Sequence, residues 1–473
     1  MLKQRISKKS SAQSAFGLAA LLLCSAQLTA CKKKPLPLPP PEPDPREEVL
    51  EPLPSASVAV RAPAPGPVPA RCHELPQKSP FRIGELAPIR AARDDADDGG
   101  PDEDDEVPDP YAVELGPAWA DTEGFVVSAL RSVKGQTRAL IALVGDDAAT
   151  GKLVDLGPVH GDPNPPLFAA HGKDLLLATP DSDAGGGMLK VGLVRDVHGA
   201  ATVSWGPEIT GVRRDSTVAL QVSGERAFLA YAADSGGKIR VFGVQLDPAD
   251  PKQKLSPEPL SAAGADVDSP RLALRKGGYW LAVARSLDAP KTKPKEHPSD
   301  ASADPAEDDS LLDIGTGRIE VTKLDAQGKP VSSALVVTAP GARPMSLDLA
   351  AAADGGAYVG FRGDDSTPGA EGGALELVHV KPDGTFEKVQ LGGELNGTGT
   401  PSLLVDASDS SKLWLSAAGE NGATWFGQVK EHTTLSADAW VRGGDLIAAR
   451  GGRLLLSRSK GTAAELSVVQ CAE

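Results

Sequence analysis

The side chains that most often carry catalysis or bind metals are few in this 473-residue chain and lie scattered along it. The seven histidines form no His-x-x-x-His pair and no cluster with cysteine, so a zinc site is not indicated. They are His73, His160, His171, His198, His297, His379 and His432. No Gly-x-Ser-x-Gly motif marks a serine hydrolase nucleophile. The sequence therefore predicts no catalytic residue, no metal ligand and no cofactor.

One stretch comes near a phosphate-binding loop. Gly145 is followed by Gly151-Lys152, but the spacing is one residue longer than the motif requires. Leu153 also stands where a Ser or Thr would bind magnesium. We interpret the stretch as the turn of a β-hairpin.

A second stretch comes near a calcium-binding EF-hand loop. Five residues fall on its positions 1, 3, 5, 6 and 12, namely Asp95, Asp97, Gly99, Gly100 and Glu106. Asp102 occupies the position of the usual apolar residue, and no amphipathic helix flanks the stretch. We therefore predict a solvated acidic loop at 93–110, which holds ten Asp and Glu residues, with a calcium site as the alternative.

The first 31 residues carry a targeting pattern. Four basic residues and no acidic one precede an apolar run at 15–23, which is too short to span a bilayer. The run leads to Leu28-Thr29-Ala30-Cys31, which resembles the lipobox of bacterial lipoproteins. The resemblance implies that residues 1–30 are a signal peptide and that the Cys31 thiol receives a diacylglycerol. The alternative is an ordinary signal peptide with Cys31 as a bystander.

Lipidation would fix the location of the chain, because several acyl chains anchor stably where one binds only marginally. Lys32 follows the cysteine in place of the Asp that retains many lipoproteins at the inner membrane. We therefore predict a lipid-anchored protein of the cell envelope at the outer membrane, on its periplasmic face or the cell surface. Removal of residues 1–30 with their four cations takes the formal charge from −15 to −19, which argues against a nucleic-acid partner.

The cysteine count predicts a disulfide. The chain has four cysteines, of which Cys24 belongs to the signal peptide and Cys31 to the lipid site. Cys72 and Cys471 remain, and an exported compartment is oxidising, so we expect them to pair. Two free thiols are the alternative.

Proline and charge mark the segments outside the folded part. Thirteen prolines among residues 32–70 exclude a sheet and favour extended polyproline II, so 31–71 is predicted to be a disordered tether with a reach of roughly 120 Å. A Pro-rich ligand for a partner domain is the alternative. The segment 288–310 is predicted to be a disordered insert, because it lacks the apolar residues that offset the entropy of ordering.

The remainder, 72–473, repeats one pattern. A short apolar strand, a turn with Gly or Asp, a strongly apolar strand and a further hairpin recur at intervals of about fifty residues. Six such units begin at 117, 166, 217, 270, 344 and 401. The pattern resembles bacterial β-propellers, which implies an all-β fold built of four-stranded blades.

A seventh unit begins near 445 and supplies only three strands before Cys471. A lone strand at 80–86 follows Cys72 and would complete this unit. We therefore predict a single propeller with seven blades, closed by N- and C-terminal strands of one blade, which removes the exposed strand edges. Six or eight blades, or two β-sandwich domains, are the alternatives.

Two function classes follow from this architecture. The first is a non-catalytic binding or scaffold module that presents a propeller face to a protein or glycan. The second is a carbohydrate-active hydrolase or lyase with a site at the channel mouth, built from residues of several blades. Carboxylates with His or Arg at that mouth would favour the enzyme, and a mouth of Ala, Gly and Ser would favour the scaffold.

Overall fold

The computed structural model describes residues 72–84, 113–287 and 317–471, except 77–79, 134, 162, 184–185, 214–216, 251, 263–265, 341, 343, 364–374, 392–399, 419–422, 430–438, 443 and 461. Cys31, the tether at 31–71, the acidic loop at 93–110 and the insert at 288–310 lie outside these residues. The part described is built of strands and contains no helix, so it has none that is long and apolar enough to cross a membrane.

The strands pair as successive antiparallel meanders. The first has Val113–Ala120 (β3), Phe125–Val133 (β4), Gln136–Val144 (β5) and Gly151–Pro158 (β6). The second has Leu167–His171 (β7), Asp174–Asp183 (β8), Gly186–Arg195 (β9) and Thr202–Val212 (β10). The third has Val218–Ser223 (β11), Arg226–Ser235 (β12), Lys238–Leu246 (β13) and Glu258–Pro259 (β14).

Three further meanders follow along the chain. The fourth has Asp266–Arg275 (β15), Gly278–Ser286 (β16), Gly317–Asp325 (β17) and Leu335–Val336 (β18). The fifth has Pro344–Ala351 (β19), Ala357–Gly363 (β20), Leu375–Val380 (β21) and Phe386–Val389 (β22). The sixth has Ser402–Asp406 (β23), Asp409–Ala418 (β24), Ala423–Val429 (β25) and Ala439–Arg442 (β26).

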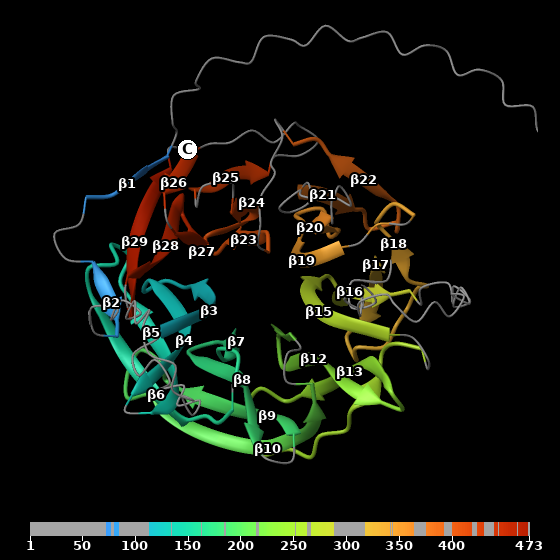
Figure 1. Cartoon of the computed structure of the whole chain (residues 1–473), viewed down its shortest axis with the longest axis horizontal. Coiled ribbons are helices and arrows are strands. Elements are labelled where there is room, and N and C mark those ends of the chain that lie inside the picture. Colours follow the sequence, from blue (N-terminus) through green and yellow to red (C-terminus); the bar gives the residue numbers. More distant parts are fainter. Residues whose placement is uncertain are drawn as a thin grey trace, which may run out of the picture. The chain divides into compact units, whose positions relative to one another are not determined.

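The last meander joins the two ends of the folded part. Asp445–Arg450 (β27), Arg453–Lys460 (β28) and Ala463–Cys471 (β29) come from the C-terminal end. The strands Cys72–Glu74 (β1) and Phe81–Ile83 (β2) both pair antiparallel with β29. Figure 1 shows the meanders set around a ring, with β1 and β2 beside β29. The described residues form an all-β propeller, and their hydrogen-bonded sheets hold nine, eight, four, four and four strands, because pairing of β10 with β12 and of β23 with β27 bridges neighbouring meanders.

The core lies between neighbouring meanders. Seven apolar clusters of described residues each join one meander to the next, and one of them joins the last to the first through Leu455, Leu466 and Phe125. Successive strand residues point to opposite faces, so a strand covered on both sides must be apolar throughout. In β28, for example, Leu454 and Leu456 pack toward the sixth meander, and Leu455 packs toward the first. This double coverage explains the continuous apolar runs in the middle strands.

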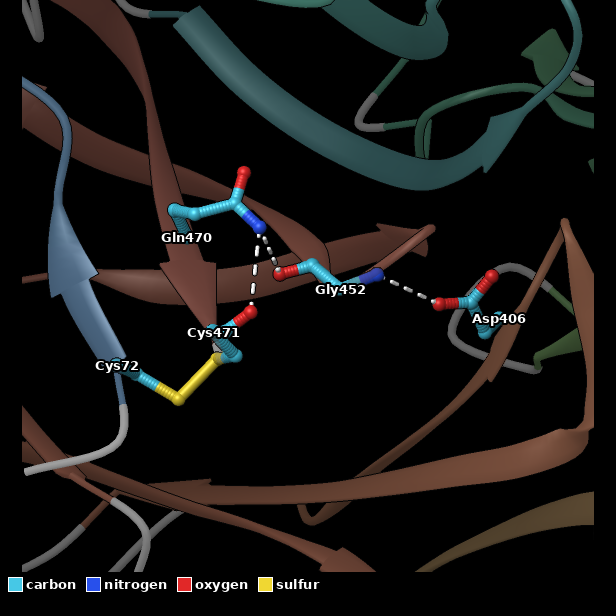
Figure 2. Close-up of a disulfide and its surroundings, with 5 residues drawn as sticks. All are labelled: Cys72, Asp406, Gly452, Gln470 and Cys471. Atoms are coloured by element: carbon cyan, nitrogen blue, oxygen red, sulfur yellow. Dashed lines mark hydrogen bonds between the residues drawn. A yellow bond between two sulfur atoms is a disulfide. The ribbon is translucent and has the colours of Figure 1, made fainter. Parts of the chain in front are cut away.

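A disulfide closes the ring. Cys72 lies opposite Cys471 in the β1–β29 register, and their sulfur atoms are bonded, with the Cα atoms 4.0 Å apart (Figure 2). Both residues are buried in the cluster between the sixth and seventh meanders. The bond joins positions 399 residues apart in the sequence.

An ion pair supports the same closure. Arg458 in β28 donates to both carboxylate oxygens of Glu74, at 2.5 and 2.7 Å, and the Ser467 hydroxyl donates at 2.8 Å. The hydrogen bond from Arg458 holds the pKa of Glu74 below its usual value, although burial opposes the shift.

Two details of the sequence prediction were wrong. The closing strand is not one segment at 80–86 but the two short strands β1 and β2, so Cys72 itself pairs with β29. The units expected at 117 and 270 begin four residues earlier, at Val113 and Asp266. For these two units, Pro117 and Pro270 were taken as the strand starts. Each proline instead lies at a bulge inside its strand, where the missing N–H costs no ladder hydrogen bond.

Candidate functional site

A cavity of about 590 Å³ lies among the first strands of the first five meanders. Its wall comes from β3, β7, β11, β15 and β19, with residues 164–165 before β7, Pro180 in β8 and Thr217 before β11. Most lining side chains are Ala, Pro, Val and Leu, and two are aromatic, Trp119 and Phe168. Both aromatic residues also pack against the core between the first two meanders, which holds them in place.

Few polar side chains line this cavity. They are Asn164, Thr217, Gln221, Arg271 and Asp348. A mostly apolar wall with a small number of polar groups is typical of small-molecule sites, and the volume lies in their usual range.

Arg271 and Asp348 form the charged pair of the cavity wall. The Nε atom of Arg271 in β15 lies 3.8 Å from Oδ1 of Asp348 in β19. Asp348 accepts hydrogen bonds from the backbone amides of Leu349, at 2.9 Å, and Leu403, at 2.8 Å. The carboxylate thus ties the fifth meander to the sixth while it faces the fourth.

The pair lies deep in the molecule, yet about a quarter of each side chain stays exposed because it borders the cavity. Burial raises the pKa of Asp348, and the charge of Arg271 and the two backbone amides oppose this rise without cancelling it. Burial likewise lowers the pKa of Arg271, against the attraction of Asp348 and Asp268.

A β-bulge places Arg271 in the wall. Asp268 pairs with Ala284 and Arg271 pairs with Ala282, so β15 holds one more residue than its partner over this step. Ser269 within the bulge has a φ of 55°, a left-handed conformation that a residue other than glycine rarely adopts. The backbone N–H of Ser269 donates to Oδ1 of Asp268 at 2.6 Å, which supports this conformation.

The candidate residues of the sequence lie elsewhere. Cys31 is outside the described residues, and neither Cys72 nor Cys471 lines the cavity. The stretch from Gly145 to Lys152 contains the hairpin turn between β5 and β6, as predicted, and its last two residues begin β6. The EF-hand candidate at 95–106 is outside the described residues.

Three histidines contact acidic residues between or within meanders. His198 Nε2 lies 2.6 Å from Asp121 Oδ2, and this contact joins a turn of the second meander to one of the first. His160 lies 3.3 Å from Asp181, and His379 lies 3.3 Å from Asp354. In the part of the chain that the structure describes, no group of three or more His, Cys, Asp or Glu is arranged to hold a metal ion.

Arg271 and Asp348 were not predicted from the sequence. Each lies within the first five residues of a predicted unit, the units at 270 and 344, and so occupies a comparable place in its repeat. This shared position in the repeat was the signal in the sequence by which the two residues could have been found. The position within the repeat indicates that a residue lies on the first strand of its meander. It does not indicate which face of that strand the side chain takes, because a one-residue bulge reverses the alternation of side chains between the two faces.

Comparison with known proteins gives likeness of fold alone. No family model and no curated protein matches the chain. It is similar to Kuenenia stuttgartiensis hydrazine synthase (13% identity, 76% of this chain and 96% of that one covered, TM-score 0.46). It is also similar to a polysaccharide lyase described as an ulvan lyase (8%, 76% and 95%, 0.49). A third is an α-L-arabinanase of Penicillium chrysogenum (10%, 62% and 89%, 0.39). Carbohydrate-active enzymes are thus among the similar structures, but at these TM-scores the likeness carries no argument about activity.

Proposed function

We propose that this chain is a membrane-anchored module of the cell envelope whose propeller binds a ligand in the cavity between its first strands. The observation that supports the proposal is the cavity itself, with its apolar wall, two aromatic residues and a partly buried Arg271–Asp348 pair. The ligand would be a glycan or a segment of a protein. The tether at 31–71 would hold the domain at 72–473 away from the membrane.

Binding fits the site better than hydrolysis. Most glycoside hydrolases use two carboxyl groups that flank the bond to be cut. Among the described residues that line the cavity, Asp348 is the one carboxylate, and each of its oxygens already accepts a backbone amide.

A carbohydrate-active hydrolase or lyase is the second candidate, and a carboxylate beside an arginine, Asp348 with Arg271, is part of the composition expected for it. The raised pKa of Asp348 favours it, because the general acid of such enzymes is a carboxyl group whose pKa is raised by burial. This candidate needs a second catalytic group, and Arg271 is the charged neighbour that could stabilise developing negative charge.

We expect the full-length protein in detergent to capture envelope glycan or protein through the cavity and to show no turnover of glycan or ester substrates. Leu274, 38% exposed, lines the cavity, so Leu274→Trp should fill it and reduce capture at least about 10-fold. Val331→Trp places the same side chain at a position 54% exposed outside the lining and should capture like wild type. Hydrolysis that disappears in Asp348→Asn would establish the enzyme instead.

The anchor has its own test. If the lipobox is read by the lipoprotein pathway, Cys31→Ser removes the acceptor thiol, and the precursor stays unlipidated. Metabolic labelling with a fatty-acid probe should then mark the wild-type protein and not the variant. Equal labelling of both would exclude Cys31 as the lipid site, and Cys24→Ser serves as the matched control that keeps the label.

A further inference from the structure

We infer that the cavity ligand is a neutral, polyhydroxylated chain such as an uncharged oligosaccharide, and that Arg271 is the residue that recognises its hydroxyl groups. The inference rests on the proposed function, since it takes the cavity as the binding site. Four observations support it: unused hydrogen-bonding groups, balanced charge, an apolar wall and a strained bulge.

The cavity wall carries hydrogen-bonding groups that the protein leaves unused. Arg271 Nη1 donates to the Pro270 carbonyl at 3.1 Å, but Nη2 has no hydrogen-bond partner among the described residues. The side-chain amide of Asn164 has none there either. Gln221 Nε2 donates to the Leu272 carbonyl at 3.2 Å, which leaves its carbonyl oxygen as an acceptor. Donors and acceptors therefore stand together in the wall, and a hydroxyl group can serve both.

The charge of the wall is balanced. The Nε atom of Arg271 lies 3.8 Å from Asp348 Oδ1, and the carboxylate of Asp268 also attracts the guanidinium electrostatically. A carboxylated or sulfated ligand that approached Arg271 would meet Asp348, and the chain carries a formal charge of −15. A cationic ligand would meet the guanidinium. A neutral ligand avoids both costs, because it brings no unpaired charge into a buried site.

The rest of the wall suits the apolar faces of sugar rings. Trp119 and Phe168 lie on neighbouring first strands, β3 and β7, and aliphatic residues surround them. Flat apolar surfaces pack against the C–H faces of a pyranose, while its hydroxyl groups point to the edge. A volume of about 590 Å³ holds a ligand of drug-like size, roughly that of a di- or trisaccharide.

The bulge shows that the wall is built around Arg271. Side chains alternate between faces, so without the extra residue between Asp268 and Arg271 the arginine would turn to the other face of the sheet. The fold keeps the extra residue at the cost of a left-handed Ser269, and strained backbone of this kind gathers at functional sites.

The test titrates detergent-solubilised full-length protein with hexasaccharides of three charge classes, measured by isothermal titration calorimetry. The probes are neutral gluco- and manno-hexaoses, hexagalacturonate, and hexaglucosamine. We expect a neutral probe to bind and the charged probes to bind at least about 10-fold more weakly. Arg271→Gln should weaken the neutral probe about 10- to 100-fold, the usual effect of losing a charge-assisted hydrogen bond. Arg271→Lys keeps the charge and loses the planar guanidinium, so its affinity for the neutral probe should lie between those of wild type and Arg271→Gln.

Arg275→Gln is the matched control, since Arg275 lies on the same strand outside the cavity lining and should leave affinity unchanged. Thermal melts verify that every variant is folded. Preference for a charged hexamer, equal affinity of Arg271→Gln and wild type, or no binding of any probe would overturn the inference. None of these results affects the outcome of the Leu274→Trp capture test, which asks whether the cavity is the binding site. The two experiments therefore distinguish a wrong ligand class from a wrong binding site.

Discussion

Replacement of both Cys72 and Cys471 by alanine is expected to cause a large loss of stability. The bond closes a loop of 399 residues, for which the chain-entropy model gives at most about 6 kcal/mol. For a domain of this size that corresponds to a melting temperature lower by about 5–10 °C. The two cysteines also fill part of a buried apolar cluster, so their truncation adds a small packing cost.

The loss should be local before it is global. β1 and β2 have three residues each and pair only with β29 among the described strands, so they keep few hydrogen bonds once the covalent tie is gone. Amide exchange should rise at 80–84 and 445–470 and change little in the other meanders under mild conditions. The Glu74–Arg458 pair limits the fraying, because it joins β1 to β28 without the sulfur bond.

Mass spectrometry without reduction gives the direct check, and wild-type protein must yield a peptide pair linked through these cysteines. Wild type treated with a reductant is the matched control and should show the same local exchange as the double variant. Free thiols at both positions, or exchange that rises evenly along the chain, would show that the ring does not depend on this bond.

The sequence predicted the architecture because the propeller repeats one local pattern. Each middle strand is covered on both faces, so runs such as Leu175-Leu176-Leu177 and Leu454-Leu455-Leu456 identify it without knowledge of its partners. The closure was predictable for a separate reason, since only two cysteines were left to pair. Strand starts at proline were misplaced because the pattern does not distinguish a proline at a strand start from one in a bulge.

The charged residues of the cavity wall could not be predicted from the repeat pattern. Arg271 and Asp348 belong to different meanders and approach each other only because the ring places β15 beside β19. Both residues lie among apolar residues, in strands whose sequences are typical of the protein core. The register shift that brings Arg271 to the cavity follows from pairing with β16, which the spacing of one strand cannot reveal.

Asp406 carries the second prediction, because one buried carboxylate joins the sixth meander to the seventh. Asp406 ends β23 and is 1% exposed. It accepts hydrogen bonds from the amides of Ser408 and Gly451, both at 2.8 Å, and of Gly452 at 3.2 Å (Figure 2 shows the last). Gly451 and Gly452 form the β27–β28 turn, with φ values of 55° and 74° that favour glycine.

Asp406→Ala is therefore expected to lower the free energy of unfolding by about 3–5 kcal/mol. Three backbone donors lose their acceptor, and each buried donor left without a partner costs about 1–3 kcal/mol before water relieves part of the loss. Asp406→Asn keeps one acceptor oxygen and should lose less. The loss should also reach the disulfide end of the chain, since Cys471 N donates to the carbonyl of Gly452 at 2.8 Å.

Urea denaturation measures this difference, and Asp409→Ala is the control. Asp409 stands three residues further on, accepts the amide and hydroxyl of Ser411 and lies 3.8 Å from Lys412 Nζ, but 44% of its side chain is exposed. Water replaces the lost acceptor there, so stability should change little. If the two alanine variants lost the same stability, the buried carboxylate would not be the joint between the meanders. The parallel β23–β27 pairing and the apolar cluster beneath it would then hold the sixth and seventh meanders together without it.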